Sequence, residues 1–123
     1  ASKLMKSHRL INTLFRKHIA RHGLTNSQCS QLLVLSKRRE ISQNTLGQVL
    51  FLEKSSVKRN MEKLTERGYF DKTAQPKIVI TAAGLKKIDS VIPAWNAAMQ
   101  EATNLLGDDG IAALDLVLTK LAS

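Results

Sequence analysis

Apolar residues recur at helical spacing through most of the chain. Residues 4–21 hold them on one face, and basic side chains cover the opposite face. Gly23 suits the left-handed backbone that ends a helix. Thr25 and Gln28 then have the spacing of a capping box, in which two side chains satisfy unpaired amides at a helix start. The pattern predicts a first helix, and a second helix that closes on the basic residues 37–39.

Two shorter helices follow in the pattern. Ser42 can cap a third helix that contains Leu46. After a turn at residues 51–53, a fourth helix is predicted near 54–67, and Gly68 is placed to end it. We expect the inward face of this fourth helix to hold Val57, Met61 and Leu64.

The apolar period changes over residues 69–81. Tyr69-Phe70 and Ile78-Val79-Ile80 are β-favouring runs, and the turn-forming residues 73–76 separate them. This arrangement predicts a small two-stranded hairpin.

A long fifth helix is predicted after Thr81, which can cap it. Pro93 removes a backbone donor and should kink this helix near Asp89, and Gly107 should end it. Asp108 or Asp109 can cap a final helix. Along the fifth helix, apolar residues are spaced alternately three and four residues apart. This spacing is typical of the seam along which one helix packs on another helix. The seam residues are Leu85, Ile88, Ile92, Trp95, Met99, Ala102 and Leu106.

Charge narrows the classes of function. The 123 residues suit one domain. Nineteen Lys and Arg against ten Asp and Glu give a net charge of +9, and all but one of the basic residues lie within residues 1–87. This imbalance favours a polyanionic partner, although scattered charge can also serve solubility alone. No apolar run approaches the ~20 residues that span a bilayer, so we expect neither a membrane partner nor a signal peptide.

The strongest functional signal lies between Leu46 and Leu64. A helix-turn-helix needs a small residue where its helices cross and an apolar residue in its turn, and Gly47 and Leu52 meet these needs. The second helix then presents four cations and two hydroxyls away from the core: Lys54, Ser55, Ser56, Lys58, Arg59 and Lys63. The alternative is an ordinary helical hairpin with a solvated face. A basic hairpin directly afterwards favours a winged helix-turn-helix.

The sequence resembles the MarR family of bacterial and archaeal transcription regulators. The resemblance lies in "GLTNSQCSQLLVL", "ISQNTLGQVLFLEKSSVKRNMEKLTERGYF" and "IVITAAG", in this order. It implies a mainly α fold with a small β-hairpin wing, and a homodimer held by long N- and C-terminal helices. In this interpretation residues 1–123 are one domain: 1–22 and 82–123 dimerise, 25–81 form the winged lobe, 54–67 the recognition helix and 69–81 the wing.

The resemblance also assigns DNA contacts. Ser55, Ser56 and Arg59 take the base-reading positions, and Gln43 and Asn44 face the DNA backbone. The family's Asp-x-Arg wing tip is missing, and Phe51 stands where the family often has Gly. The expected DNA-binding set is Gln43, Asn44, Lys54, Ser55, Ser56, Lys58, Arg59, Lys63, Lys72 and Lys77.

A small aromatic effector is a further implication of the resemblance. Members of the family often bind small aromatic acids between the dimer body and the winged lobe, where His18, Cys29 and Trp95 would lie. Cys29, the only cysteine, could instead sense redox state, although it shares a face with apolar residues. His18 and His22 are four residues apart but form an incomplete metal site, so we expect neither a metal nor a cofactor.

The sequence therefore predicts a cytoplasmic, nucleoid-associated regulator in a bacterium or archaeon. We expect a homodimeric repressor that binds a palindromic operator in double-stranded DNA and is released by a small ligand. The alternative is a non-specific architectural DNA binder or a winged-helix module for protein interaction. No catalytic motif is present, so an enzyme is not expected.

Overall fold

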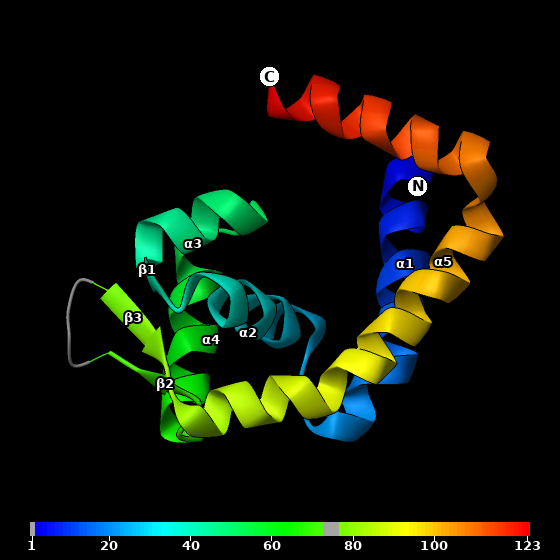
Figure 1. Ribbon diagram of the computed structural model, residues 1–123. Coiled ribbons are helices and arrows are strands. Elements are labelled where there is room, and N and C mark those ends of the chain that lie inside the picture. Colours follow the sequence, from blue (N-terminus) through cyan, green and yellow to red (C-terminus); the bar gives the residue numbers. More distant parts are fainter. Residues whose placement is uncertain (1, 73–76) are drawn as a thin grey trace.

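The computed structural model describes residues 2–72 and 77–123, which form a lobe and two long helices (Figure 1). The helices are α1 (Lys3–Ile19), the 3-10 turn η1 (Ala20–His22), α2 (Asn26–Arg38), α3 (Gln43–Leu50), α4 (Lys54–Glu66) and α5 (Ala82–Ala122). The strands are β1 (Glu40–Ser42), β2 (Phe70–Asp71) and β3 (Lys77–Ile80). In the lobe, α2, α3 and α4 pack with the strands, and α1 and α5 lie against each other beside it. The predicted fold class, mainly α with a small wing, is confirmed.

The helix ends follow the local signals in the sequence. Gly23 has a φ of 74° and ends the first helical segment. The Gln28 amide donates to Thr25 Oγ1, and the Thr25 amide donates to Gln28 Oε1, both at 3.1 Å. Ser42 and Thr81 each accept a hydrogen bond from the amide three residues later. The predicted capping box and both predicted caps are thus confirmed.

The sheet has one strand more than the predicted hairpin. β3 pairs antiparallel with β2 on one side and with β1 on the other. Ser42 of β1 lies opposite Lys77, and Ile41 is the buried residue of this strand. Three residues are too few to reveal a period of two, which is why the pattern missed β1. The turn predicted at residues 73–76 lies outside the described residues.

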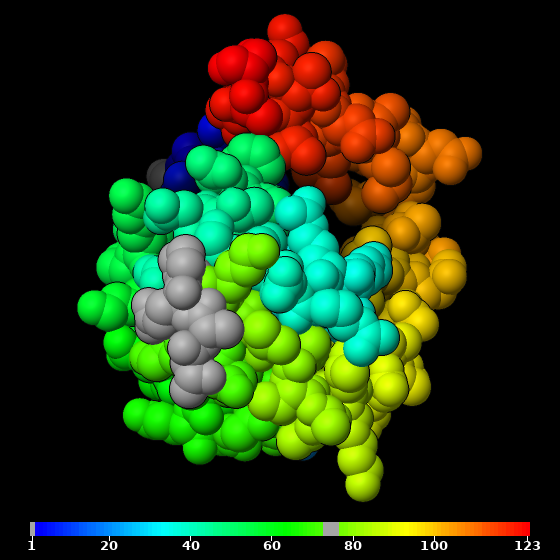
Figure 2. Space-filling view, turned by 60° about the vertical axis from the view of Figure 1, so that its left-hand side comes forward, coloured from blue at the N-terminus to red at the C-terminus, as the bar shows by residue number. Residues whose placement is uncertain are grey.

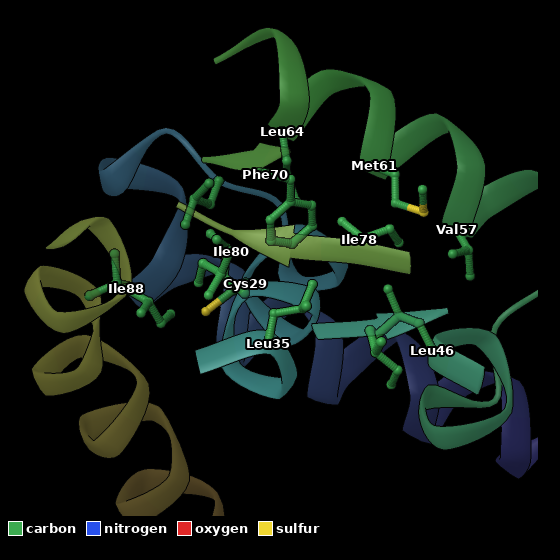
Figure 3. Close-up of a cluster of buried hydrophobic side chains, with 14 of the residues drawn as sticks. Cys29, Leu35, Leu46, Val57, Met61, Leu64, Phe70, Ile78, Ile80 and Ile88 are labelled. Carbon is green, nitrogen blue, oxygen red and sulfur yellow. The ribbon is translucent and has the colours of Figure 1, made fainter. Parts of the chain in front are cut away.

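The core lies where α2, α4 and β3 meet, and α5 closes one side of it (Figure 3). Leu35 and Leu46 are fully buried there, and Ile88 joins them from α5. The predicted inward face of α4 is confirmed, since Val57, Met61 and Leu64 are all buried. This packing fixes which side of α4 remains outside.

α5 buries a stripe that differs from the predicted seam. Gly84, Val91, Ala94 and Ala98 are buried together with Ile88, whereas Met99 of the predicted seam is 45% exposed. The seam pattern predicts one neighbouring helix, but α5 packs on α2 as well as on α1. Three residues of this buried stripe are small: Gly84, Ala94 and Ala98.

The predicted break at Gly107 is present. Gly107 has φ 69° and ψ 178°, which are not helical, and the chain changes direction there. Asp109 Oδ1 accepts a hydrogen bond from the Gly110 amide at 2.9 Å. Pro93 keeps helical dihedral angles, so α5 continues through it, and Figure 1 shows the helix bending in its yellow part, near the predicted kink.

The two long helices expose apolar side chains. Figure 2 shows the orange and red segment after Gly107 projecting beyond the lobe, and its Leu116 and Leu121 are exposed. An apolar groove of about 390 Å³ also runs between α1 and α5. Its walls include Leu10, which is 71% exposed, and Leu105, which is 74% exposed.

A candidate nucleic-acid interface

α4 presents a cationic face to the outside. Its buried residues recur at steps of four and three, so the side chains between them point outward. Ser56 is half-buried, and the other predicted groove-facing residues are exposed: Lys54, Ser55, Lys58, Arg59 and Lys63. The structure thus places all six on the surface of one helix, away from the core.

The first turn of α4 receives no hydrogen bond from the side chain of its N-cap residue. Glu53 takes the position before the helix, but its side chain makes no capping hydrogen bond. The first amides of a helix point along its axis, and the helix dipole makes this end partly positive. Lys54 adds a full charge to the same end. This combination suits a phosphate.

α3 brings two amide side chains to the same surface. Gln43, Asn44 and Lys54 all line a hollow of about 520 Å³ between α3 and the start of α4. A Cβ on Gly47 would lie 3.3 Å from the Leu52 carbonyl oxygen, so this position needs a small residue, as the sequence predicted. The crossing of the two helices therefore brings Gln43 and Asn44, the predicted backbone contacts, beside Lys54 at the start of α4.

The two predicted cations of the wing differ in how far they are exposed to solvent. Lys72 is half-buried, while Lys77 is exposed. Lys77 Nζ lies 3.1 Å from Glu40 Oε1, and both side chains are more than half exposed. Sequence reasoning missed this pair because Glu40 belongs to the strand that it did not predict. Glu40 partly offsets the positive charge that Lys77 offers to a phosphate.

Arg67 joins the end of α4 to the turn before α2. Its Nη1 donates to the Gly23 carbonyl oxygen at 2.7 Å, and its guanidinium lies 5.3 Å from the centre of the Tyr69 ring. The hydrogen bond to Gly23 joins residues 44 positions apart. Nothing in the local pattern marks Arg67, and it was missed for that reason.

His18 and Trp95, two of the three predicted effector residues, have partners between α1 and α5. His18 Nε2 lies 3.2 Å from Glu101 Oε2, and Lys17 Nζ lies 2.8 Å from Glu101 Oε1. Hydrogen bonds from Lys17, and then from His18, lower the pKa of Glu101. The Trp95 ring lies 5.1 Å from the ring of Phe15.

Cys29, the third predicted effector residue, lies in the core. Its side chain has no exposed surface, and desolvation by burial raises its pKa to about 11. A thiol with a raised pKa carries little thiolate, which is the reactive form. Burial therefore argues against the alternative that Cys29 senses redox state.

A polar hollow lies on the other side of α1. It has a volume of about 520 Å³ and is lined by Arg9, Asn12, Thr13, Arg16, Thr25, Asn26 and Ser27. Both arginines are exposed, and Arg16 Nη2 donates to Thr13 Oγ1 at 3.2 Å. Two guanidinium groups beside hydroxyls and amides suit an anion.

Within residues 2–72 and 77–123, no three His, Cys, Asp or Glu side chains gather closely enough to hold a metal ion. In the same part of the chain, no helix has the length and apolar character needed to cross a membrane.

Comparison with known proteins gives a family match for part of the chain and a fold for most of it. Residues 22–77 match the model of the MarR family, and no curated protein matches the chain. A probable transcriptional regulator from Pseudomonas aeruginosa aligns with 22% identity and a TM-score of 0.80, covering 96% of this chain and 92% of that one. The transcriptional regulator MosR from Mycobacterium tuberculosis aligns with 24% identity and a TM-score of 0.84, covering 97% and 90%. BpsR from Bordetella bronchiseptica, whose DNA binding is regulated by 6-hydroxynicotinic acid, aligns with 18% identity and a TM-score of 0.84, again covering 97% and 90%.

Proposed function

Residues 22–77 of this chain belong to the MarR family, and from this premise we propose that the chain is a sequence-specific DNA-binding transcriptional regulator. It acts as a homodimer on a palindromic operator. The observation that carries the proposal is the outer face of α4, where cations and hydroxyls lie together on a helix that the core holds from behind. A dimer on its operator covers DNA that a polymerase must reach, so repression is the mode of control that we propose.

The contacts divide into two kinds. Ser55, Ser56 and Arg59 would face base edges, because an α-helix fits the major groove and a guanidinium can bond a guanine edge twice. Gln43, Asn44 and Lys54 would hold a phosphate in the hollow between α3 and α4. The remaining cations, Lys58, Lys63, Lys72 and Lys77, would add attraction that is independent of sequence.

The dimer would use the exposed apolar surfaces of α1 and α5. The groove that contains Leu10 and Leu105, together with the apolar segment after Gly107, supplies a surface that a second copy can cover. A twofold axis would place the two α4 helices about 34 Å apart, one turn of B-DNA. The operator would then be an imperfect palindrome.

Arg59→Ala and Lys77→Ala separate base reading from phosphate binding. Arg59→Ala should cost about 1–3 kcal/mol on the operator and relax preference at one base pair. Lys77→Ala should weaken binding to all duplexes similarly and reduce the slope of log K against log salt by about one. Both variants are measured on an operator selected from a random pool and on unrelated duplex, across a salt series.

Two outcomes would replace the proposal. If Arg59→Ala lowers affinity equally for operator and unrelated duplex, α4 does not read bases, and a non-specific architectural role replaces the regulator. If the wild-type protein binds no duplex, a protein-interaction module replaces both.

The effector site that we propose is the polar hollow beside α1, and its ligand is an aromatic carboxylate. The support is the pair Arg9 and Arg16 in a hollow of suitable size, together with the regulation of BpsR by 6-hydroxynicotinic acid. This acid at saturating concentration should raise the Tm by about 3 °C and weaken operator binding. Arg16→Gln should remove both effects. Arg21→Gln, a matched change at an exposed cation outside the hollow, should keep both. Equal responses of the two variants would exclude this site.

A further inference from the structure

Phe51 combines two features that proteins usually avoid. Its side chain is 71% exposed, although it is a large apolar ring. Its backbone has φ 54° and ψ 41°, in the left-handed region, where a residue with a Cβ is disfavoured. Gly or Asn in this position would remove both costs. An unfavourable residue with an exposed ring suggests a role outside the folding of the protomer.

The position of the ring indicates its partner. Phe51 ends α3, and its amide donates to the Gly47 carbonyl oxygen, so the turn fixes its backbone. Phe51 lines the same hollow as Gln43, Asn44 and Lys54. The hollow therefore offers amide donors and a cation beside an apolar wall.

The DNA backbone has the complementary chemistry. Each phosphate carries a negative charge and is followed by a deoxyribose, which is largely apolar. We infer that the Phe51 ring packs on the deoxyribose next to the phosphate held by Gln43, Asn44 and Lys54. The inference rests on the proposed function, and it adds a contact that the sequence did not assign.

This contact has its own signature. Every nucleotide has a deoxyribose, so the ring contributes equally on operator and unrelated duplex. The ring is uncharged and releases no counterions, so it does not change the salt dependence of binding. Lys54, in the same hollow, should contribute to the salt slope.

The test is Phe51→Asn, because Asn tolerates the left-handed region and removes the ring. We expect its affinity to fall about tenfold on both duplexes, which is about 1.4 kcal/mol, with an unchanged salt slope. Its Tm should rise by about 3 °C, since the backbone strain is relieved. Loss of affinity in a more stable protein cannot come from unfolding.

Three controls accompany this variant. Phe51→Tyr keeps the ring and should bind within about twofold of the wild type, because little contact area changes. Val49→Ala removes another exposed apolar side chain of α3, outside the hollow, and should leave affinity unchanged. Lys54→Ala should reduce the salt slope by about one.

The outcomes are distinct. Wild-type affinity in Phe51→Asn, or loss on the operator alone, would overturn the inference while leaving the regulator intact. A change in the sedimentation of Phe51→Asn would assign the ring to contacts between copies of the chain and overturn the inference as well. A wild-type protein that binds no duplex would overturn the proposed function first.

Discussion

Gly84→Ala is expected to lower the free energy of unfolding by about 3 kcal/mol, the upper end of the cost of overpacking a core. A Cβ on Gly84 would overlap the Tyr69 carbonyl oxygen and would lie 2.7 Å from Cγ1 of Ile80. The Tyr69 oxygen cannot move freely, because it accepts hydrogen bonds from the amide and hydroxyl of Thr81 at 3.0 and 3.1 Å. The Tm should fall by about 10 °C.

The direction of the stability change caused by Gly84→Ala distinguishes close packing from helix propensity. Gly84 has helical backbone, where Ala is ordinarily better than Gly by about 1 kcal/mol. A loss of stability therefore measures the close approach of α5 to the sheet. Gly47→Ala is the graded control, because its Cβ would meet the Leu52 oxygen at 3.3 Å, and it should cost less. Urea unfolding at one fixed protein concentration checks both variants. Equal or greater stability of Gly84→Ala would contradict the close packing of α5 on the wing.

Leu105→Lys is expected to convert the proposed dimer to a monomer at micromolar concentration. The side chain is 74% exposed in the protomer and lines the apolar groove between α1 and α5. An unpaired ammonium inside an interface costs several kcal/mol of desolvation. Because a monomer binds only one half-site, affinity for the full operator should fall at least about 100-fold, while half-site affinity should hardly change.

Thr103→Lys is the matched control for this prediction. Thr103 is exposed on the same turn of α5 and does not line the groove. The same added charge there should leave both the oligomeric state and operator binding intact. Sedimentation and operator titration test the pair. A dimeric Leu105→Lys would show that a second copy covers some other surface.

Sequence and structure agree best where the evidence is local. The capping box of Thr25 and Gln28 and the ends at Gly23 and Gly107 each depend on neighbouring residues. The helix-turn-helix was equally readable, since Gly47 and the buried face of α4 follow from short spacings. The DNA-contacting residues remain predictions, although the structure places their α4 members together on its outer face.

Contacts between distant parts of the chain could not be predicted in this way. β1 exists because Ile41 packs into the core and β3 offers a free edge, and neither fact is visible in three residues. Lys77 meets Glu40, and Arg67 reaches Gly23, only once the sheet and α4 are in place. Gln31 is fully buried, and the described part of the chain provides no hydrogen-bond partner for the Nε2 and Oε1 atoms of its side chain.

The sequence by itself determined the helices, the caps at Thr25, Ser42 and Thr81 and the outward face of α4, because backbone preferences and apolar periods act over a few residues. Only the tertiary structure decided which stripe of α5 is buried and that Lys77 pairs with Glu40. It also decided that Phe51 shares a hollow with Lys54. These features depend on distances between segments, and a pattern along the chain carries no such distances until the core has brought the segments together.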